Sequence, residues 1–352
     1  MKHDAPNERP LVSVVIPNWN MRDLLDRCLQ SILQSSYENF EVIVVDDGSS
    51  DGSPELVREK YGSDPRLTLL VNRFNQGVSK ACNCGYEHSR GKYVVFTHSD
   101  VYVAADWLQP LVEALEADPT IGAAQGKILS SQNPRVILNG GSTIDYLGVP
   151  HTGQDYLTAD KGDRDQPRDI FYAWPASMIV PKGILEKVGA FDSDYFYCYD
   201  DVDLGWRMWL AGYRIVYVPE SRIWHVHGVT GRAVPADFTY RAYRNNLLTL
   251  LKNYGWGNLL LFFPLAFGLS LVKAAMSMLL VDRRQGQAAL KGTWWVVVHP
   301  AFIWKRRRQV QRLRRAPDSV IMRLMARPSP GHYLHMLRGR PERQQRPAQG
   351  KH

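Results

Sequence analysis

The chain has 352 residues, of which 45% are hydrophobic and 22% are charged, and this composition excludes a globally disordered protein. Its net charge of +8 is uneven, because 17 lysines and arginines and only 3 acids follow residue 281, which leaves about −6 for the preceding part. The four cysteines lack the spacing of a disulfide framework or a zinc knuckle, so we expect reduced thiols.

From residue 11 to about 218, short β-rich apolar runs alternate with stretches whose apolar residues have helical spacing. This alternation predicts an α/β fold with a Rossmann-like, mostly parallel sheet flanked by crossover helices. A stretch rich in Gly, Asp, Asn and Pro, 126–169, is expected to form loops and edge strands. The expected strands are 12–16, 40–45, 67–71, 93–98 and 214–218. The expected helices are 24–34, 54–60, 78–88, 107–117, 184–188 and 202–211.

The character of the chain changes after about residue 230. An amphipathic helix that carries Arg241, Arg244 and Lys252 is expected at 238–254. The run 259–281 is almost wholly apolar, and about 23 residues rise roughly 34 Å as a helix, enough to cross a bilayer. A second apolar run, 294–304, is too short to span and leads directly into a basic block.

These features predict two units, an α/β domain at 1–235 and, at 236–352, membrane-associated helices with a basic tail. The tail indicates an anionic partner, for which a membrane surface is favoured over nucleic acid. Because the N-terminal residues show no secretory signal, we expect the body on the cytoplasmic side, and the positive-inside rule keeps the tail there too. We therefore expect interfacial or re-entrant helices; a hairpin span and a helix buried in the core are the alternatives. Removal of everything after about residue 235 should leave the body folded.

Two motifs follow the first two predicted strands. Pro17 and Trp19 form a turn at the carboxyl edge of the sheet, where ligands bind in such folds, and Trp19 can stack on a base or belong to the core. Asp46 and Asp47 end the second strand, and a carboxylate there can accept hydrogen bonds from a pyrimidine base or a ribose. Helix capping explains the later Asp51 better than it explains this pair.

Two further motifs suit a diphosphate and a cation. Around Asn75 and Gly77 the backbone can approach a ligand closely, and Lys80 near a helix start can face phosphate, although the glycine-rich turn alone is a weak signal. His98 and Asp100 flank one residue, so in extended chain both point the same way, as two ligands of a divalent cation would.

The last two motifs lie near the end of the predicted domain. Asp200, Asp201 and Asp203 begin a helix; the helix dipole accounts for one or two of them, and crowding raises a pKa and supplies a general base. His225 and His227 alternate in an extended segment, and either can bind a metal.

In their order and spacing, these pieces resemble family-2 glycosyltransferases of the GT-A fold, closest to a rhamnosyltransferase-like branch that builds bacterial surface polysaccharides. The resemblance covers about residues 11–231. It is carried by Val-Ser-Val-Val-Ile-Pro at 12–17, Val-Val-Asp-Asp-Gly-Ser-Ser-Asp-Gly-Ser at 44–53, Asn-Gln-Gly at 75–77, Asp100, Gly-Ala-Phe-Asp at 189–192, Asp-Asp-Val-Asp-Leu at 200–204, Ala-Gly-Tyr-Arg at 211–214 and Trp-His at 224–225.

The resemblance implies an inverting transfer from a nucleotide-diphosphate sugar. The acid at the sheet edge suits a pyrimidine and so favours a dTDP or UDP donor, and the tail favours a membrane-linked acceptor such as a polyprenyl-linked glycan. Asp47, with Asp46, would hold the base. Asp100 would hold the Mn²⁺ or Mg²⁺ that bridges the diphosphate, with His225 or His227 completing that site. Asp201 would be the catalytic base, with Asp200 where the family usually has Glu. His98 departs from the family's Asp-x-Asp, and it either binds the metal or shapes the pocket.

Two other functions compete with a transferase. A sugar nucleotidyltransferase would need a glycine-rich first turn with a basic residue, whereas Pro17, Asn18 and Trp19 occupy that turn here. A non-catalytic, membrane-bound nucleotide-sugar-binding or scaffold protein would tolerate loss of the acids, whereas Asp100 and Asp201 are both present. All hypotheses about the site require that Asp47, Asp100 and Asp201 converge at one edge of the sheet.

Overall fold

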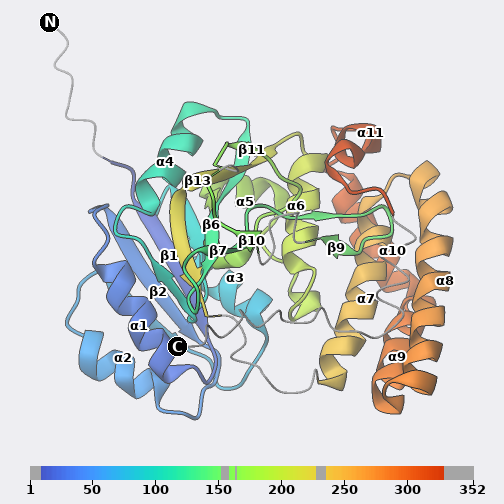
Figure 1. Ribbon diagram of the computed structural model, residues 1–352, viewed down its shortest axis with the longest axis horizontal. Coiled ribbons are helices and arrows are strands. Elements are labelled where there is room, and N and C mark those ends of the chain that lie inside the picture. Colours follow the sequence, from blue (N-terminus) through green and yellow to red (C-terminus); the bar gives the residue numbers. More distant parts are fainter. Residues whose placement is uncertain (1–8, 152–157, 163–164, 227–234, 329–352) are drawn as a thin grey trace, which may run out of the picture.

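The structure is a computed structural model that describes residues 9–151, 158–162, 165–226 and 235–328. An 11-stranded mixed sheet has the strand order β10-β7-β6-β12-β4-β1-β2-β3, with β5, β11 and β13 attached. In Figure 1, β1 and β2 of this sheet lie on the side of the molecule opposite α8. Strands β4, β1, β2 and β3 are mutually parallel, and β6 pairs in parallel with β13. The fold class is thus the α/β layout expected from the strand–helix alternation.

The strands have the following bounds: β1 Val12–Asn18, β2 Phe40–Asp46, β3 Leu67–Val71, β4 Tyr93–Phe96, β5 Val101–Val103, β6 Ile121–Ser130, β7 Val136–Asn139, β8 Thr143–Ile144, β9 Pro150–His151, β10 Thr158–Ala159, β11 Arg168–Asp169, β12 Met178–Pro181 and β13 Arg214–His225. The helices are α1 Arg22–Leu33, α2 Ser53–Tyr61, α3 Val78–His88, α4 Leu108–Ala117, α5 Lys182–Val188, α6 Asp200–Leu210, α7 Ala236–Asn253, α8 Trp256–Leu280, α9 Arg283–Val298, α10 Pro300–Gln311 and α11 Asp318–Ile321.

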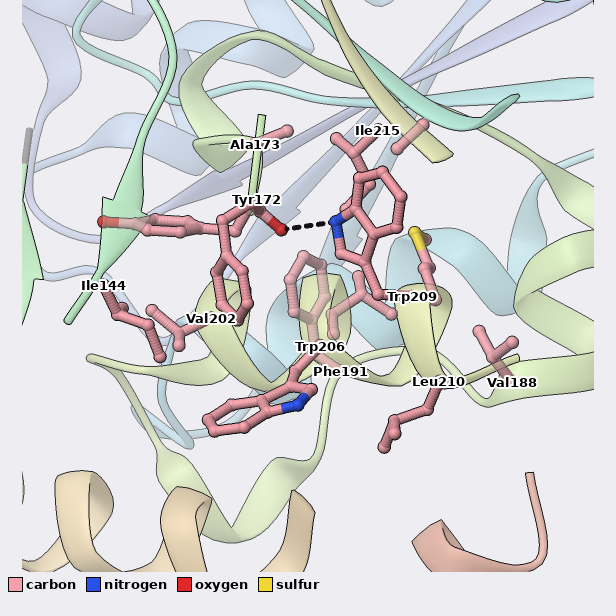
Figure 2. Close-up of a cluster of buried hydrophobic side chains, with 14 of the residues drawn as sticks. Ile144, Tyr172, Ala173, Val188, Phe191, Val202, Trp206, Trp209, Leu210 and Ile215 are labelled. Carbon is pink, nitrogen blue, oxygen red and sulfur yellow. Dashed lines mark hydrogen bonds between the residues drawn. The ribbon is translucent and has the colours of Figure 1, made fainter. Parts of the chain in front are cut away.

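Alternation along the central strands divides the core into two layers. Val14 and Ile16 of β1 belong to a cluster with apolar residues of α1, α2 and α4, while Val15 belongs to a cluster with residues of α5 and α6 on the other face. Figure 2 shows the second cluster around Trp206 and Trp209 of α6. The Trp209 indole N–H donates to the Phe171 carbonyl at 3.0 Å, so α6 is fixed by packing and by a buried hydrogen bond.

Two expectations for the strands were wrong in extent. Gly126 does not begin a loop but lies within β6, where an added Cβ would come 2.6 Å from the Ser221 hydroxyl, so this glycine permits close packing of β13. Strand β13 does not stop at Val218 but continues to His225 past a register shift. The bulged segment between Val218 and Arg222 hides the continuation in the sequence pattern.

The helices after residue 235 share the core of the preceding part. Leu247 and Leu250 of α7 and Ile303 and Val310 of α10 belong to the same buried cluster as Trp206. Helices α7 to α10 stand together beside α6 in Figure 1. The boundary at 235 therefore marks a change in composition along the chain. The residues on its two sides pack into one shared hydrophobic core.

Helix α8 is the apolar run predicted at 259–281, extended at its start to Trp256. It is the one helix among the described residues that is long and apolar enough to cross a membrane, and only 22% of its most apolar window is buried inside the protein. The alternative of a helix enclosed by the protein's own core does not fit that exposure.

Candidate active site

A cleft of about 760 Å³ opens at the carboxyl ends of the central parallel strands. Asp47 after β2, Asp100 after β4 and Asp201 at the start of α6 all line it, although more than 150 residues separate the first from the last. The shared cleft that every site hypothesis required is therefore present. The other lining residues are Pro17, Asn18, Trp19, Met21, Asn75, Gly77, Val78, Ala81, Cys82, His98, Ser99, Pro175, Phe196, Tyr197, Cys198, Asp200, Pro235 and Asp237.

The paired acids after β2 have different surroundings. Asp47 lines the cleft, and its carboxylate accepts hydrogen bonds from the Asn72 amide at 2.8 Å and from the Gln76 and Gly77 backbone N–H groups at 2.9 Å. Asp46 does not line the cleft. Its carboxylate accepts from the Asn18 amide and the Ser49 N–H, both at 2.9 Å, and so ties the ends of β1 and β2 together. Asp47 faces the ligand space and Asp46 supports it.

The loop between β3 and α3 forms one wall. Gly77 has φ +93°, and an added Cβ would lie 2.5 Å from the Phe196 ring, so a side chain there would push the two walls apart. Asn75 accepts a hydrogen bond from the Gly77 N–H at 2.9 Å. Lys80 is exposed and is not a lining residue, so it does not face the cleft as predicted. Trp19 lines the cleft with 52% of its surface exposed, which rules out a core tryptophan.

A cluster suited to a metal ion lies on the same edge. One ligand atom each of His98, Asp100 and His225 falls within 4.8 Å of the others. Antiparallel pairing places His225 opposite Val101, and its Nε2 lies 3.4 Å from Asp100 Oδ1. His227 lies outside the described residues. The long-range pairing of β13 with β5 thus assembles the site.

The chemistry of this cluster fits a divalent cation. Burial lowers the pKa of His98 and the neighbouring His225 lowers it further, against the attraction of Asp100, so the imidazole is neutral at pH 7, the form that binds metals. Asp100 Oδ1 and His225 Nδ1 are buried atoms without a hydrogen-bond partner among the described residues. Buried polar atoms without partners are rare, and a coordinated ion satisfies them.

The three acids of α6 have three different environments. Asp200 accepts a hydrogen bond from the Ser79 hydroxyl at 2.9 Å, and burial raises its pKa. Burial, and then the Asp200 charge, raise the pKa of Asp201 to about 8. Asp203 is fully buried and pairs with Arg207 at 2.8 Å, so it is structural. Asp201 has the environment of a general base or acid.

The sequence pattern did not predict that the residues just before α6 line the cleft. Phe196, Cys198 and Tyr199 all have left-handed φ values, of 69°, 63° and 67°, and such strain in non-glycine residues concentrates at functional sites. Tyr197 donates its hydroxyl to Asp237 at 2.7 Å, and both residues line the cleft. Aromatic residues between two acidic motifs carry no signature in a single sequence.

Comparison with known proteins agrees with this geometry. Residues 13–189 match the model of the family described as "Glycosyl transferase family 2". The chain belongs to that family, and its fold is the GT-A fold of the solved structures that follow.

Similar structures include a mannosyltransferase from Pyrobaculum calidifontis in complex with GDP-Man and Mn²⁺, with a TM-score of 0.52, 23% identity and coverage of 88% of this chain and 87% of that one. Residues 1–349 of Staphylococcus aureus TarS in complex with UDP give a TM-score of 0.54 at 18% identity and cover 89% of each chain.

The O-antigen biosynthesis protein RfbC of Myxococcus xanthus is 27% identical over 249 residues, which cover 67% of this chain and 19% of that protein. The chain spans between 16% and 40% of the length of three other curated relatives.

Proposed function

We propose that the chain is a metal-dependent, inverting glycosyltransferase that moves a hexosyl or rhamnosyl group from a dTDP- or UDP-sugar to a glycan or lipid-linked acceptor in cell-surface polysaccharide synthesis. The observation that carries the proposal is the convergence of Asp47, His98, Asp100 and Asp201 in one cleft. His225 adjoins this group, with its Nε2 3.4 Å from Asp100 Oδ1. A base-binding acid, a cation site and a candidate general base are the groups that such a transfer needs.

In the proposed donor site, Trp19 offers an exposed ring for base stacking and Asp47 offers carboxylate oxygens to the base or ribose. Asp47 is held by the backbone of Gln76 and Gly77, so it is oriented before any ligand arrives. Asn75 and Gly77, which belong to the loop between β3 and α3, also line the cleft. Asp46 does not contact the donor in this proposal; it supports the site by joining the ends of β1 and β2 through Asn18 and Ser49.

In the proposed reaction, the Asp201 carboxylate removes the proton of the acceptor hydroxyl as the oxygen attacks the anomeric carbon. Attack from the face opposite the leaving diphosphate inverts the configuration. Asp200 helps to keep the proton affinity of Asp201 high. His98, Asp100 and His225 would hold the cation, which when bound neutralises the departing diphosphate; the two imidazoles favour Mn²⁺ over the oxygen-seeking Mg²⁺.

A thermal-shift measurement tests the donor and the cation together. Saturation with a dTDP- or UDP-sugar plus Mn²⁺ should stabilise the protein by about 2.7 kcal/mol at one hundred times Kd, a rise of several degrees in melting temperature. Asp100→Ala should lose the Mn²⁺-dependent part. The exposed Asp106 supplies a matched control, and Asp106→Ala should keep it. Absence of stabilisation by every nucleotide sugar with either cation would refute the proposal.

We propose that the enzyme works at the cytoplasmic face of an anionic membrane, as a peripheral or re-entrant protein. Exposed apolar side chains on α8 and α9 support this, among them Leu260 at 71%, Leu261 at 58% and Trp294 at 54% exposure. Of the basic block 305–308 on the neighbouring α10, Lys305 and Arg308 are exposed, whereas Arg307 is buried and Arg306 pairs with Asp194. Apolar area plus cations is the surface that interfacial helices present to anionic lipid.

Liposome flotation tests this location. Leu260→Ser with Leu261→Ser removes apolar surface of about two leucines and should weaken binding to vesicles of phosphatidylglycerol and phosphatidylcholine at least tenfold. Val71→Ser on β3, where the valine is also exposed, should float like the unmodified protein. Equal flotation of all three proteins would contradict an attachment through α8.

A further inference from the structure

A second cavity, which the donor site does not use, lies between α7, α8 and the β8–β9 segment. Its volume is about 340 Å³. Helix α8 contributes one face to it, Ala266, Leu269, Ser270, Lys273, Met276 and Ser277, at the three- and four-residue spacing of a single helical stripe. The other walls come from Leu147, Val149, Pro150, Tyr199, Ala242, Tyr243, Asn246 and Val281. We call this cavity the α8 groove.

The α8 groove is mostly apolar but contains one cation. Lys273 is the single charged residue of α8 and is half-buried in the groove wall. The buried carboxylate of Asp145, behind the Leu147–Val149 turn, attracts its ammonium group. An ionisable residue within a membrane-embedded helix is costly, and it is a candidate functional residue by default.

The position of the groove relates it to the proposed catalytic cleft. Tyr199 lines the groove, while its neighbours Cys198, Asp200 and Asp201 line the cleft, so the turn before α6 is a partition between the two. Asn246 donates to the Tyr199 hydroxyl at 2.9 Å and holds the ring in that partition. Along α7, Asp237 lines the cleft, whereas Ala242, Tyr243 and Asn246 line the groove, about 8–14 Å away at 1.5 Å per residue.

We infer that the α8 groove binds the lipid end of the acceptor, with Lys273 contacting its phosphate and the apolar walls contacting the first part of its chain. This assignment rests on the proposed function and adds the acceptor's subsite to it. Bulk phospholipid would need no cavity beside the catalytic helix, whereas a lipid-linked acceptor has to place its phosphate within a few sugar lengths of Asp201. Val281 both lines the groove and is exposed, as are the adjacent Leu279 and Leu280, so apolar surface outside the groove adjoins its lining.

Binding of farnesyl phosphate and of farnesol in neutral detergent micelles, followed by intrinsic tryptophan fluorescence, tests the assignment. The full chain should bind farnesyl phosphate at least tenfold more tightly than farnesol. Lys273→Met should abolish that preference, and Lys273→Arg should retain most of it. Lys291→Met, which removes an exposed lysine of the neighbouring α9, should leave it intact and so control for general attraction to anions.

Three results would overturn the inference: no preference in the unmodified chain, a preference that survives Lys273→Met, or equal displacement by phosphatidylglycerol, which would identify a general phospholipid site. The melting temperature of each variant shows whether it is folded. If Lys273→Met does not fold, the phosphate preference of Lys273→Arg still tests the inference. Because this measurement contains no nucleotide sugar, it reports only on binding of the lipid phosphate to the α8 groove. Donor binding is tested separately by the thermal-shift measurement.

Discussion

Asp201→Asn should lower kcat/KM for sugar transfer about 10²- to 10⁴-fold, the usual contribution of a positioned general base. Asparagine preserves the shape of the side chain but cannot accept the proton of the acceptor hydroxyl. Donor binding should persist, because the contacts proposed for the base and the cation lie at Asp47 and at the His98–Asp100–His225 cluster. Steady-state kinetics together with donor-induced thermal shift separate the two effects.

Asp23→Asn is the matched control for that variant. Asp23 also lies in the first turn of a helix, α1, but its side chain is 93% exposed and does not line the cleft. A loss caused only by the helix dipole would appear in both variants. Undiminished transfer by Asp201→Asn would remove the proposed base, and a scaffold function would then account for the site better.

The pH dependence of the reaction should identify the same group. The pKa of Asp201 is raised to about 8, so the ionised base is the minority form at pH 7 and the rate should rise with pH towards 8. A cation bound in the same cleft favours the carboxylate, so saturating Mn²⁺ should move this rise to lower pH. In Asp201→Asn the rise should be absent.

Stability should show the opposite trend. Because the folded-state pKa of Asp201 exceeds its value of 3.8 in the unfolded chain, its contribution to stability is fully present below pH 4 and is lost as the pH rises through about 8. The Asn variant has no such loss. Its melting temperature relative to the unmodified protein should therefore increase between pH 4 and pH 8, an exchange of activity for stability.

The parts of the site that sequence could predict are those fixed by local pattern. A buried run followed by acids predicts a carboxylate at the sheet edge, as found for Asp47 and Asp100. Which of Asp46 and Asp47 faces the ligand depends on how the chain turns after β2, and the pattern of residues is the same either way. His225 joins Asp100 only through the pairing of β13 with β5, about 120 residues apart in sequence, which no local signal specifies.

Lys252 illustrates the same limit for α7. The sequence pattern shows it only as one of the cations carried by an amphipathic helix. In the structure it is 1% exposed, and its ammonium contacts Asp192 at 2.6 Å and Asp203 at 2.9 Å. The prediction that the chain before residue 235 folds without α7 does not agree with this contact, because removal of α7 would leave both carboxylates without their shared partner. Whether a lysine is exposed or neutralises buried carboxylates depends on its burial, which is set by the tertiary fold and not by the local sequence pattern.

Lys252→Met should therefore reduce the free energy of unfolding by about 3–5 kcal/mol, the usual cost of breaking a buried ion pair by removing one partner. Burial alone would raise the pKa values of Asp192 and Asp203, and Lys252 overcomes that effect to lower both. Their contribution to stability is present above pH 4 and is lost as the pH falls, so the difference between Lys252→Met and the unmodified protein should shrink in acid.

A double-mutant cycle assigns this loss to the ion pairs rather than to a cavity. Without Lys252, Asp192 keeps only a longer contact with Arg306 at 3.9 Å, whereas Asp203 keeps Arg207 at 2.8 Å. Adding Asp192→Asn to Lys252→Met removes the more weakly compensated carboxylate, so the double variant should recover part of the stability measured by urea denaturation. A cavity would leave the double variant at least as unstable as Lys252→Met alone. If the recovery is seen, the charges that hold α7 also hold α6, the helix whose first turn contains Asp201. The helices proposed to face the membrane and the proposed catalytic base would then share one structural support.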